Sequence, residues 1–189
     1  MISCEEAEYD GAKVGRVVWI TGLSGSGKSS LANAFVERIR RRTQNVVLLD
    51  GDELRSLFVV TDNETAEYDL DARLNLARQY QRLCKMLAVQ GVFVVIATIS
   101  LFREVHAWNR NNLPRYFEVY LKVPLEELRR RDPKGIYSRF DKGSLLNVLG
   151  CDLPIEEPER PDWSIEFDPN VSVEQLAETL IEKINREKL

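Results

Sequence analysis

At positions 22–29 the sequence reads Gly22-Leu23-Ser24-Gly25-Ser26-Gly27-Lys28-Ser29. A glycine, four further residues and then Gly-Lys-Ser have the spacing of a P-loop. The apolar run at 17–20 before this stretch predicts a buried parallel strand. After it, apolar residues at helical spacing predict a helix over 30–42. A strand, a glycine-rich loop and a helix in this order form a binding site for nucleotide phosphates.

The loop carries the groups that phosphate binding needs. Its glycines let the backbone turn tightly and aim N–H groups at phosphate oxygens, and the helix start adds a partial positive charge. Lys28 is expected to reach the β- and γ-phosphates, and the Ser29 hydroxyl to bind Mg²⁺. We therefore predict ATP and Mg²⁺ as cofactors. The predicted nucleotide-binding residues are Gly22, Leu23, Ser24, Gly25, Ser26, Gly27, Lys28, Ser29 and Ser30. A glycine-rich turn that binds nothing is disfavoured, because both flanking patterns fit.

Length and charge limit the remaining choices. The 189 residues suffice for one domain with a buried core, which we place at 15–189. The net charge of −4 argues against a nucleic-acid partner, and no apolar run approaches the ~20 residues of a membrane span. Residues 1–14 are predicted to be a flexible leader. Because the acidic N-terminus has no apolar signal core, we expect a cytoplasmic protein.

Cysteine and histidine are too few for a disulfide frame or a zinc site. Cys4, Cys84 and Cys151 include no Cys-x-x-Cys pair and are interpreted as reduced thiols. The single histidine, His106, is interpreted as a surface or helix residue.

Apolar and helical patterns alternate along the rest of the chain. They predict strands at 46–49, 92–97, 117–123 and 163–167, with 46–49 buried and 92–97 central, and helices at 53–58, 70–89, 102–112, 125–131 and 172–188. Residues 61–68 are expected to be a mobile loop, and 132–161 lack periodicity. The expected inner face of the long helix is Leu74, Ala77, Leu83, Leu87 and Ala88. This alternation predicts a three-layer α/β fold of the P-loop NTPase type, a parallel sheet with helices on both faces.

Ligands of open parallel sheets bind beyond the carboxyl ends of the strands. This rule brings the P-loop together with Asp50, Asp52 and residues 98–100. One of the two carboxylates can position Mg²⁺, and the other can accept the proton of an attacking hydroxyl. Alternatively, both cap the helix that starts at Glu53. Arg55, one helical turn further on, is predicted either to bind an anionic substrate or to lie on a solvated helix face.

Basic residues occur at two further places. Arg73 and Arg78, with Asn75 near them, lie on the long helix, where a solvated position is the commoner outcome. The basic helix end at 129–131 instead runs into a loop that can close over ATP. We therefore predict a lid at about 129–161, and we expect Arg131 to stabilise the charge of the transferring phosphoryl group.

Four blocks of the sequence resemble the adenylylsulfate kinase family. They are Gly22-Leu23-Ser24-Gly25-Ser26-Gly27-Lys28-Ser29, Leu49-Asp50-Gly51-Asp52-Glu53-Leu54-Arg55, Ile99-Ser100 and Arg131-Asp132-Pro133-Lys134-Gly135-Ile136-Tyr137. The match runs from about residue 17 to residue 161. The resemblance implies a P-loop kinase fold and an enzyme that uses MgATP to phosphorylate the 3′-hydroxyl of adenylylsulfate.

The resemblance also implies roles for individual residues. It assigns Asp52 to the Mg²⁺ and hydroxyl region, Arg55 to the substrate and Lys134 to the lid side of the substrate. Ser100 matches the serine given for the family as a phosphoserine intermediate, although direct in-line transfer requires none. The family's Arg-x-x-Asn is here Arg73-Leu74-Asn75, so only one of the two can be in register. The predicted catalytic residues are Lys28, Asp52, Ser100 and Arg131. The predicted substrate-binding residues are Asp50, Asp52, Arg55, Arg73, Asn75, Ile99, Lys134 and Val148, and the predicted metal ligands are Ser29 and Asp52.

The acceptor side departs from the family pattern. The usual Leu-Gly-Phe segment is replaced by Leu57-Phe58-Val59-Val60-Thr61-Asp62, and Val148 stands where a second aromatic residue is usual. In the family these two rings sandwich the acceptor's adenine, and stacking contributes ~1–3 kcal/mol per ring, so adenine binding should weaken here. The segments 98–101 and 108–110 resemble the branch that phosphorylates cytidine diphosphoramidate for capsular phosphoramidate.

We therefore expect a small-molecule kinase whose acceptor is a nucleoside 5′-diphosphate derivative, with cytidine diphosphoramidate in first place. A true adenylylsulfate kinase is the first alternative. A regulatory module that binds ATP without transfer is the second, and Asp52 and the arginine-rich lid disfavour it because binding alone needs neither. The sequence leaves a monomer and a homodimer both open.

Overall fold

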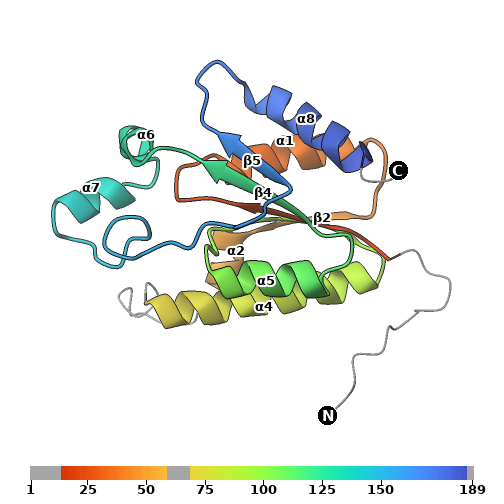
Figure 1. Cartoon of the computed structure of the whole chain (residues 1–189), viewed down its shortest axis with the longest axis horizontal. Coiled ribbons are helices and arrows are strands. Elements are labelled where there is room, and N and C mark those ends of the chain that lie inside the picture. Colours follow the sequence, from red (N-terminus) through yellow and green to blue (C-terminus); the bar gives the residue numbers. More distant parts are fainter. Residues whose placement is uncertain (1–13, 59–68, 187–189) are drawn as a thin grey trace, which may run out of the picture.

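The computed structural model describes residues 14–58 and 69–186. The predicted leader, apart from Val14, and the predicted loop at 61–68 lie outside the described residues. The sheet has five strands: β1 (Val17–Thr21), β2 (Val46–Asp50), β3 (Phe93–Ala97), β4 (Phe117–Lys122) and β5 (Trp163–Glu166). Their order is β2-β3-β1-β4-β5, and every neighbouring pair is parallel. The predicted parallel α/β sheet is confirmed (Figure 1).

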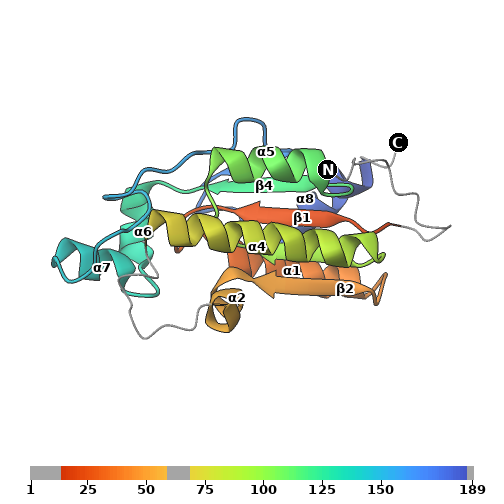
Figure 2. The ribbon, with the colours of Figure 1, turned by 90° about the horizontal axis from the view of Figure 1, so that it is seen from below.

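Helices cover both faces of this sheet. They are α1 (Lys28–Arg40), α2 (Gly51–Phe58), α4 (Leu70–Val89), α5 (Arg103–Asn112), α6 (Leu125–Arg131), α7 (Ile136–Asp141) and α8 (Val173–Arg186). One face packs against α1 and α8, and the opposite face packs against α4 and α5, which lie side by side in Figure 2. The two resulting apolar cores give the three layers that the sequence predicts. None of the described helices is both long and apolar enough to cross a lipid bilayer.

Two strand positions differ from the prediction. The middle strand is β1, whose residues Val17 to Ile20 are completely buried, and β3 lies beside it as an inner strand. The strand β2, expected to be buried, forms one edge of the sheet and is only partly buried along its length. Its apolar composition reflects packing of one edge strand against helices on both faces, a case that sequence pattern alone does not separate from a central strand.

The inner face of α4 is confirmed but is wider than predicted. Ala77 and Ala88 are buried, and Leu74, Leu83 and Leu87 are partly buried and pack against the same core. The buried residues of this face also include Leu76, Tyr80, Gln81 and Cys84, which the prediction did not name. Gln81 can be buried because its amide donates hydrogen bonds to the backbone oxygen of Val105 and to the side chain of Asn109 on α5. These partners turn the buried face of α4 toward α5, which apolar spacing alone could not show.

His106 lies on α5 as predicted, but it is buried rather than at the surface. Its Nδ1 is 2.7 Å from the carboxylate of Glu118 on β4, an interaction that makes burial of a polar ring tolerable. The last helix begins with a reciprocal cap. The amide of Gln175 donates to the Ser172 hydroxyl at 3.2 Å, and the Gln175 side chain accepts from the Ser172 amide at 2.8 Å.

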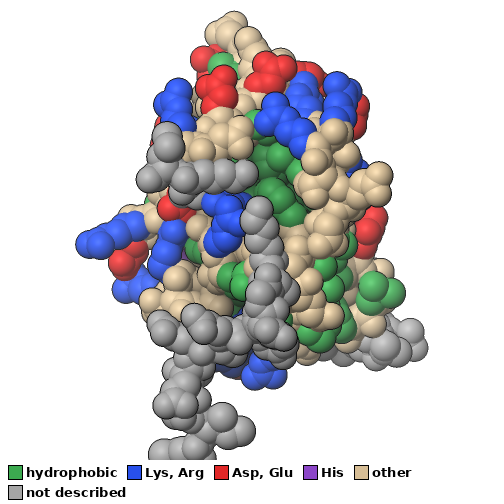
Figure 3. Space-filling model, turned by 90° about the vertical axis from the view of Figure 1, so that its right-hand side faces the viewer, with side chains coloured by type: hydrophobic (Ala, Val, Ile, Leu, Met, Phe, Trp, Pro, Cys, Tyr) green, Lys and Arg blue, Asp and Glu red, His purple; other side chains and the backbone are tan. Residues whose placement is uncertain are grey.

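The segment after α6 contains a helix that the sequence pattern did not reveal. The carboxylate of Asp132 accepts hydrogen bonds from the amides of Tyr137 and Ser138 and so starts α7. Together α6, α7 and the following loop enclose a small core of Leu128, Tyr137, Leu145 and Val148, against which Leu23 of the P-loop packs. This segment protrudes at one end of the sheet (Figure 1). In the view of the opposite end, acidic and basic side chains lie intermixed near the top, above a strip of hydrophobic side chains (Figure 3).

Candidate active site

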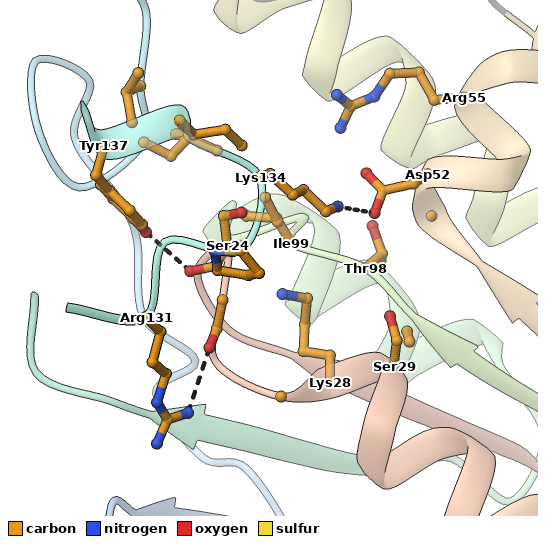
Figure 4. Close-up of a pocket in the computed structure, with 18 of the residues that line it drawn as sticks. Ser24, Lys28, Ser29, Asp52, Arg55, Thr98, Ile99, Arg131, Lys134 and Tyr137 are labelled. Atoms are coloured by element: carbon orange, nitrogen blue, oxygen red, sulfur yellow. Dashed lines mark hydrogen bonds and ion pairs between the residues drawn. The ribbon is translucent and has the colours of Figure 1, made fainter. Parts of the chain in front are cut away.

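A pocket of about 440 Å³ opens at the carboxyl ends of β1 and β3. The P-loop, the start of α2, the end of β3 and the segment from α6 to residue 149 all contribute to its wall (Figure 4). Most of the predicted site residues line it: Ser24, Gly25, Gly27, Lys28, Ser29, Ser30, Asp52, Arg55, Arg73, Ile99, Arg131, Lys134 and Val148. Gly22, Leu23, Ser26, Asp50, Asn75 and Ser100 are not in its lining. Residues that are far apart in the sequence thus surround one cavity.

The P-loop adopts a conformation that depends on glycine. Gly27, directly before α1, has φ of 95°, a left-handed value that side chains disfavour. At Gly22 a Cβ atom would lie 2.6 Å from the backbone oxygen of Leu121 on β4, so a larger residue would push the loop off the sheet. The loop therefore approaches the sheet closely and leaves the N-terminal end of α1 facing the pocket.

Lys28 lies at the bottom of the pocket, where it is only partly exposed. Its ammonium donates a hydrogen bond of 2.7 Å to the backbone oxygen of Leu23. Burial, together with the nearby positive charge of Lys134, lowers the pKa of Lys28 to about 8. An anionic ligand would therefore favour the charged form of Lys28, because phosphate oxygens would stabilise the ammonium.

Ser29 and Asp50 form the second pair at the P-loop. The Ser29 hydroxyl donates to a carboxylate oxygen of Asp50 at 2.6 Å. The other oxygen of Asp50 accepts from the backbone amide of Asp52 at 2.9 Å, so Asp50 caps α2. The hydroxyl and carboxylate oxygens at this place are the hard ligands that Mg²⁺ prefers, so the residues fit a magnesium ion bound with phosphates.

Asp52 extends from α2 across the pocket to the segment between α6 and α7 (Figure 4). Its carboxylate forms an ion pair with Lys134, which lies just before α7. Burial tends to raise the pKa of Asp52, but the hydrogen bond and charge of Lys134, and the charges of Arg55 and Lys28, outweigh it and lower that pKa. The carboxylate is therefore ionised at neutral pH and can accept a hydrogen bond from a substrate hydroxyl.

Arg131 on α6 and Tyr137 on α7 contact the backbone of the P-loop. The Tyr137 hydroxyl donates to the backbone oxygen of Ser24 at 3.0 Å, and Nη1 of Arg131 lies 3.4 Å from the backbone oxygen of Gly25. The Arg131 guanidinium also lies 4.6 Å from the ring centre of Phe167. Sequence reasoning did not single out Phe167 or the contact of Tyr137, although Tyr137 belongs to the fourth block of the resemblance.

A second cavity of about 320 Å³ adjoins the pocket. Gly27, Ser30 and Arg131 line both hollows, and the second one continues between β4, β5, the start of α8 and Phe167. Its wall is largely apolar, with Leu31, Leu121, Val123, Ile165, Val173 and Leu176. Two ligand-sized cavities thus meet at the P-loop, and transfer between two substrates requires two binding places.

The structure separates Arg73 from Asn75. Arg73 lines the pocket, and its Nη2 donates to the backbone oxygen of Asn147 at 2.9 Å. Asn75 is exposed, and its side chain accepts a hydrogen bond from Arg78. Val148, next to Asn147, is buried and lines the pocket, held by a hydrogen bond from its amide to Asp152.

Ser100 is buried, and its hydroxyl lies 2.9 Å from the hydroxyl of Thr98. Thr98 and Ile99 line the pocket, whereas Ser100, which has a positive φ of 32°, is not in its lining.

Comparison with known proteins agrees with this geometry. Residues 14–166 match the family described as adenylylsulphate kinase. A cytidine diphosphoramidate kinase from Campylobacter jejuni is 34% identical over 168 residues, which cover 89% of this chain and 95% of that protein. A probable adenylyl-sulfate kinase from Bacillus subtilis is 36% identical over 167 residues, with 87% and 81% covered.

A solved structure shows the same architecture. The Mycobacterium tuberculosis APS kinase in complex with AMPPNP and APS matches with a TM-score of 0.80 and 30% identity, over 92% of this chain and 99% of that one. The matched region includes the P-loop, the pocket residues at the sheet edge and the lid. The chain therefore belongs to the adenylylsulphate kinase family, and it is an ATP-dependent kinase that phosphorylates a hydroxyl acceptor.

Proposed function

We propose that this kinase transfers the γ-phosphoryl group of MgATP to the ribose 3′-hydroxyl of a nucleoside 5′-diphosphate derivative, with cytidine diphosphoramidate as the favoured acceptor. The reaction would then serve capsular phosphoramidate synthesis in the cytoplasm. The carrying observation is the aliphatic side chain of Val148 in the wall of the pocket. An aliphatic side chain cannot stack on a base as an aromatic ring does. The larger adenine therefore loses more binding energy here than the smaller cytosine.

The residues around the P-loop support phosphoryl transfer. Lys28 would neutralise charge between the β- and γ-phosphates, and Asp52 would orient the acceptor hydroxyl for in-line attack. Ser29, with Asp50 or Asp52 close by, would hold Mg²⁺, which neutralises charge on the phosphate oxygens. Arg55, Arg73 and Lys134 bring positive charge to the same pocket, which suits an acceptor with a negatively charged 5′ group.

Adenylylsulfate is the second candidate acceptor. It is favoured by the adenylyl-sulfate kinase relatives, which are as similar to this chain as the cytidine diphosphoramidate kinase is. Competition kinetics with the two acceptors at equal concentration would decide between them. We expect a higher kcat/KM for cytidine diphosphoramidate, and a clear preference for adenylylsulfate would overturn this choice. If ATP is bound but is not consumed with either acceptor or with related nucleotides, the non-catalytic alternative would be favoured.

Replacement of Val148 by phenylalanine should shift the acceptor preference toward adenylylsulfate. A ring at this place in the wall can stack on adenine, and the contact is worth ~1–3 kcal/mol, about tenfold to a hundredfold in affinity. The ratio of the two kcat/KM values measures the shift. Val148→Leu is the matched control, because it adds volume to the lid core without adding a ring. An equal shift in both variants would mean that repacking of the lid, rather than stacking, changes the preference.

Binding of ATP should weaken as the pH rises above 8. The pKa of Lys28 in the unliganded protein is about 8, and only the protonated ammonium pairs with phosphate oxygens. Between pH 7 and pH 9 the dissociation constant of MgATP should therefore rise by about tenfold, as proton linkage requires. Calorimetric titration at several pH values measures this dependence. Lys28→Arg stays charged throughout this range, so an equally steep dependence in that variant would assign the effect to another group.

A further inference from the structure

The carboxylate of Glu127 on α6 holds two arginines of the same helix. Its Oε1 accepts from Nε of Arg131 at 2.7 Å and from Nη2 of Arg130 at 2.8 Å, and its Oε2 accepts from Nε of Arg130 at 2.7 Å. The Glu127 side chain is only 14% exposed, whereas that of Arg130 is 73% exposed. The hydrogen bonds from Arg130 and Arg131 lower the pKa of Glu127 to about 2, so the carboxylate is charged at neutral pH.

Three contacts from different parts of the fold fix the side chain of Arg131. Glu127 binds its Nε from the preceding turn of α6, and the backbone oxygen of Gly25 lies 3.4 Å from its Nη1. The ring of Phe167, which follows β5, lies against the guanidinium at 4.6 Å. A long side chain that would otherwise sample many rotamers is thereby ordered before any ligand arrives.

Arg131 fixed in this way forms the boundary between the two cavities. The cavity beyond it is largely apolar, adjoins the start of α1 and reaches Phe167. A nucleotide whose phosphates occupy the P-loop would extend its base into this cavity, since the other side of the loop holds Asp52 and the acceptor groups. A guanidinium over a planar ring provides a cation–π contact.

We propose that Glu127 is a positioning residue that holds the guanidinium of Arg131 in place to stack on the donor's purine base. This inference builds on the use of ATP as phosphoryl donor, and it gives Arg131 a role at the base in place of the role at the transferring phosphoryl group that the sequence suggested. Glu127 does not touch the nucleotide and acts only through Arg131. An ordered arginine loses less freedom when the base binds, so the contact with Glu127 should appear as tighter donor binding rather than as faster transfer.

The test compares Glu127→Gln with the wild-type protein for two probes, MgATP and magnesium tripolyphosphate. Tripolyphosphate carries the phosphate chain without a base. We expect the dissociation constant of MgATP to rise about three- to tenfold, the size of a cation–π contact, while tripolyphosphate binding stays unchanged. The KM for ATP should rise together with this dissociation constant. The kcat at saturating ATP and the KM for the acceptor should stay unchanged. In an Arg131→Met background the Glu127→Gln change should have no further effect.

Two neighbouring substitutions serve as controls. Glu126→Gln removes an exposed carboxylate of the same helical turn, and Arg130→Met removes the other partner of Glu127. Both should bind MgATP as the wild type does. Should Glu127→Gln fail to fold, Glu127→Asp keeps the charge, shortens its reach and allows the same comparison.

Equal loss of MgATP and tripolyphosphate binding would overturn the proposal, because Glu127 would then act on the P-loop or on the fold. Unchanged MgATP binding would overturn it as well. Turnover of the wild-type protein with cytidine diphosphoramidate and adenylylsulfate, measured on the same preparations, tests the proposed function separately. A wild type that turns over neither acceptor but binds MgATP would refute the proposed function alone.

Discussion

Replacement of Lys28 by alanine is expected to reduce turnover by at least about a hundredfold, the usual loss when a stabiliser of transition-state charge is removed. Lys28 is the P-loop cation at the bottom of the pocket, and Asp50 and Asp52 lie near enough to influence its pKa. Its charge would act where the bond between the β- and γ-phosphates breaks. The unliganded protein disfavours the charged form of Lys28. Bound phosphates therefore stabilise this charge, and the charge in turn strengthens the binding of the phosphates.

Steady-state kinetics at saturating ATP measure this loss, and thermal unfolding checks that the variant is folded. Removal of Lys28 relieves the cost of burying a charge, so the variant should be at least as stable as the wild type. The exposed lysine Lys142 on the lid offers a matched control, and Lys142→Ala should keep normal turnover. Near-normal turnover of a folded Lys28→Ala variant would contradict the assignment of the P-loop as the donor site.

Most of the helices and strands were predicted correctly, because the apolar pattern that specifies each of them lies within its own segment. The limits of α4 and α6 coincide with the predicted ranges, and β1 and β4 agree within one residue. The order of the strands is different, since it depends on which strands pair across long stretches of chain. The edge position of β2 could not be recognised from four apolar residues. The helix α7 was missed because a carboxylate four residues before it, Asp132, starts it rather than an apolar period.

The same distinction holds for the pocket. Residues of the P-loop and of the strand ends could be placed from the sequence, because the parallel sheet brings strand ends to one edge. The contact of Tyr137 with Ser24 joins residues 113 positions apart, and Phe167 meets Arg131 only through the sheet order. Of the two candidates on α4, the helix orientation selects Arg73 for the pocket and leaves Asn75 exposed. Such choices depend on packing that no single segment specifies.

Replacement of Asp52 by asparagine should reduce kcat by about 10²- to 10⁴-fold, the range for loss of a positioned acid–base group. Asparagine keeps the shape of the side chain but removes the negative charge that would orient the acceptor hydroxyl and Mg²⁺. The sequence left two roles open for Asp50 and Asp52, capping of the helix and action on the substrate or Mg²⁺. Asp50 caps α2 through the amide of Asp52, whereas the carboxylate of Asp52 points across the pocket to Lys134. Loss of the Asp52 charge therefore leaves the cap in place, and stability should change little.

The ion pair with Lys134 needs a control of its own, because Asp52→Asn breaks that pair as well. Lys134→Met removes the same pair but leaves the carboxylate on α2. If Asp52 acts on the acceptor hydroxyl, Lys134→Met should raise the KM for the acceptor and lower kcat far less than Asp52→Asn does. An exposed ion pair contributes only about 0–1 kcal/mol to stability, so both variants should unfold near the wild-type temperature. Equal losses of kcat in the two variants would show that closure of the lid, and not the carboxylate itself, limits turnover. A large fall in unfolding temperature with normal kcat for Asp52→Asn would mean that Asp52 supports the fold instead.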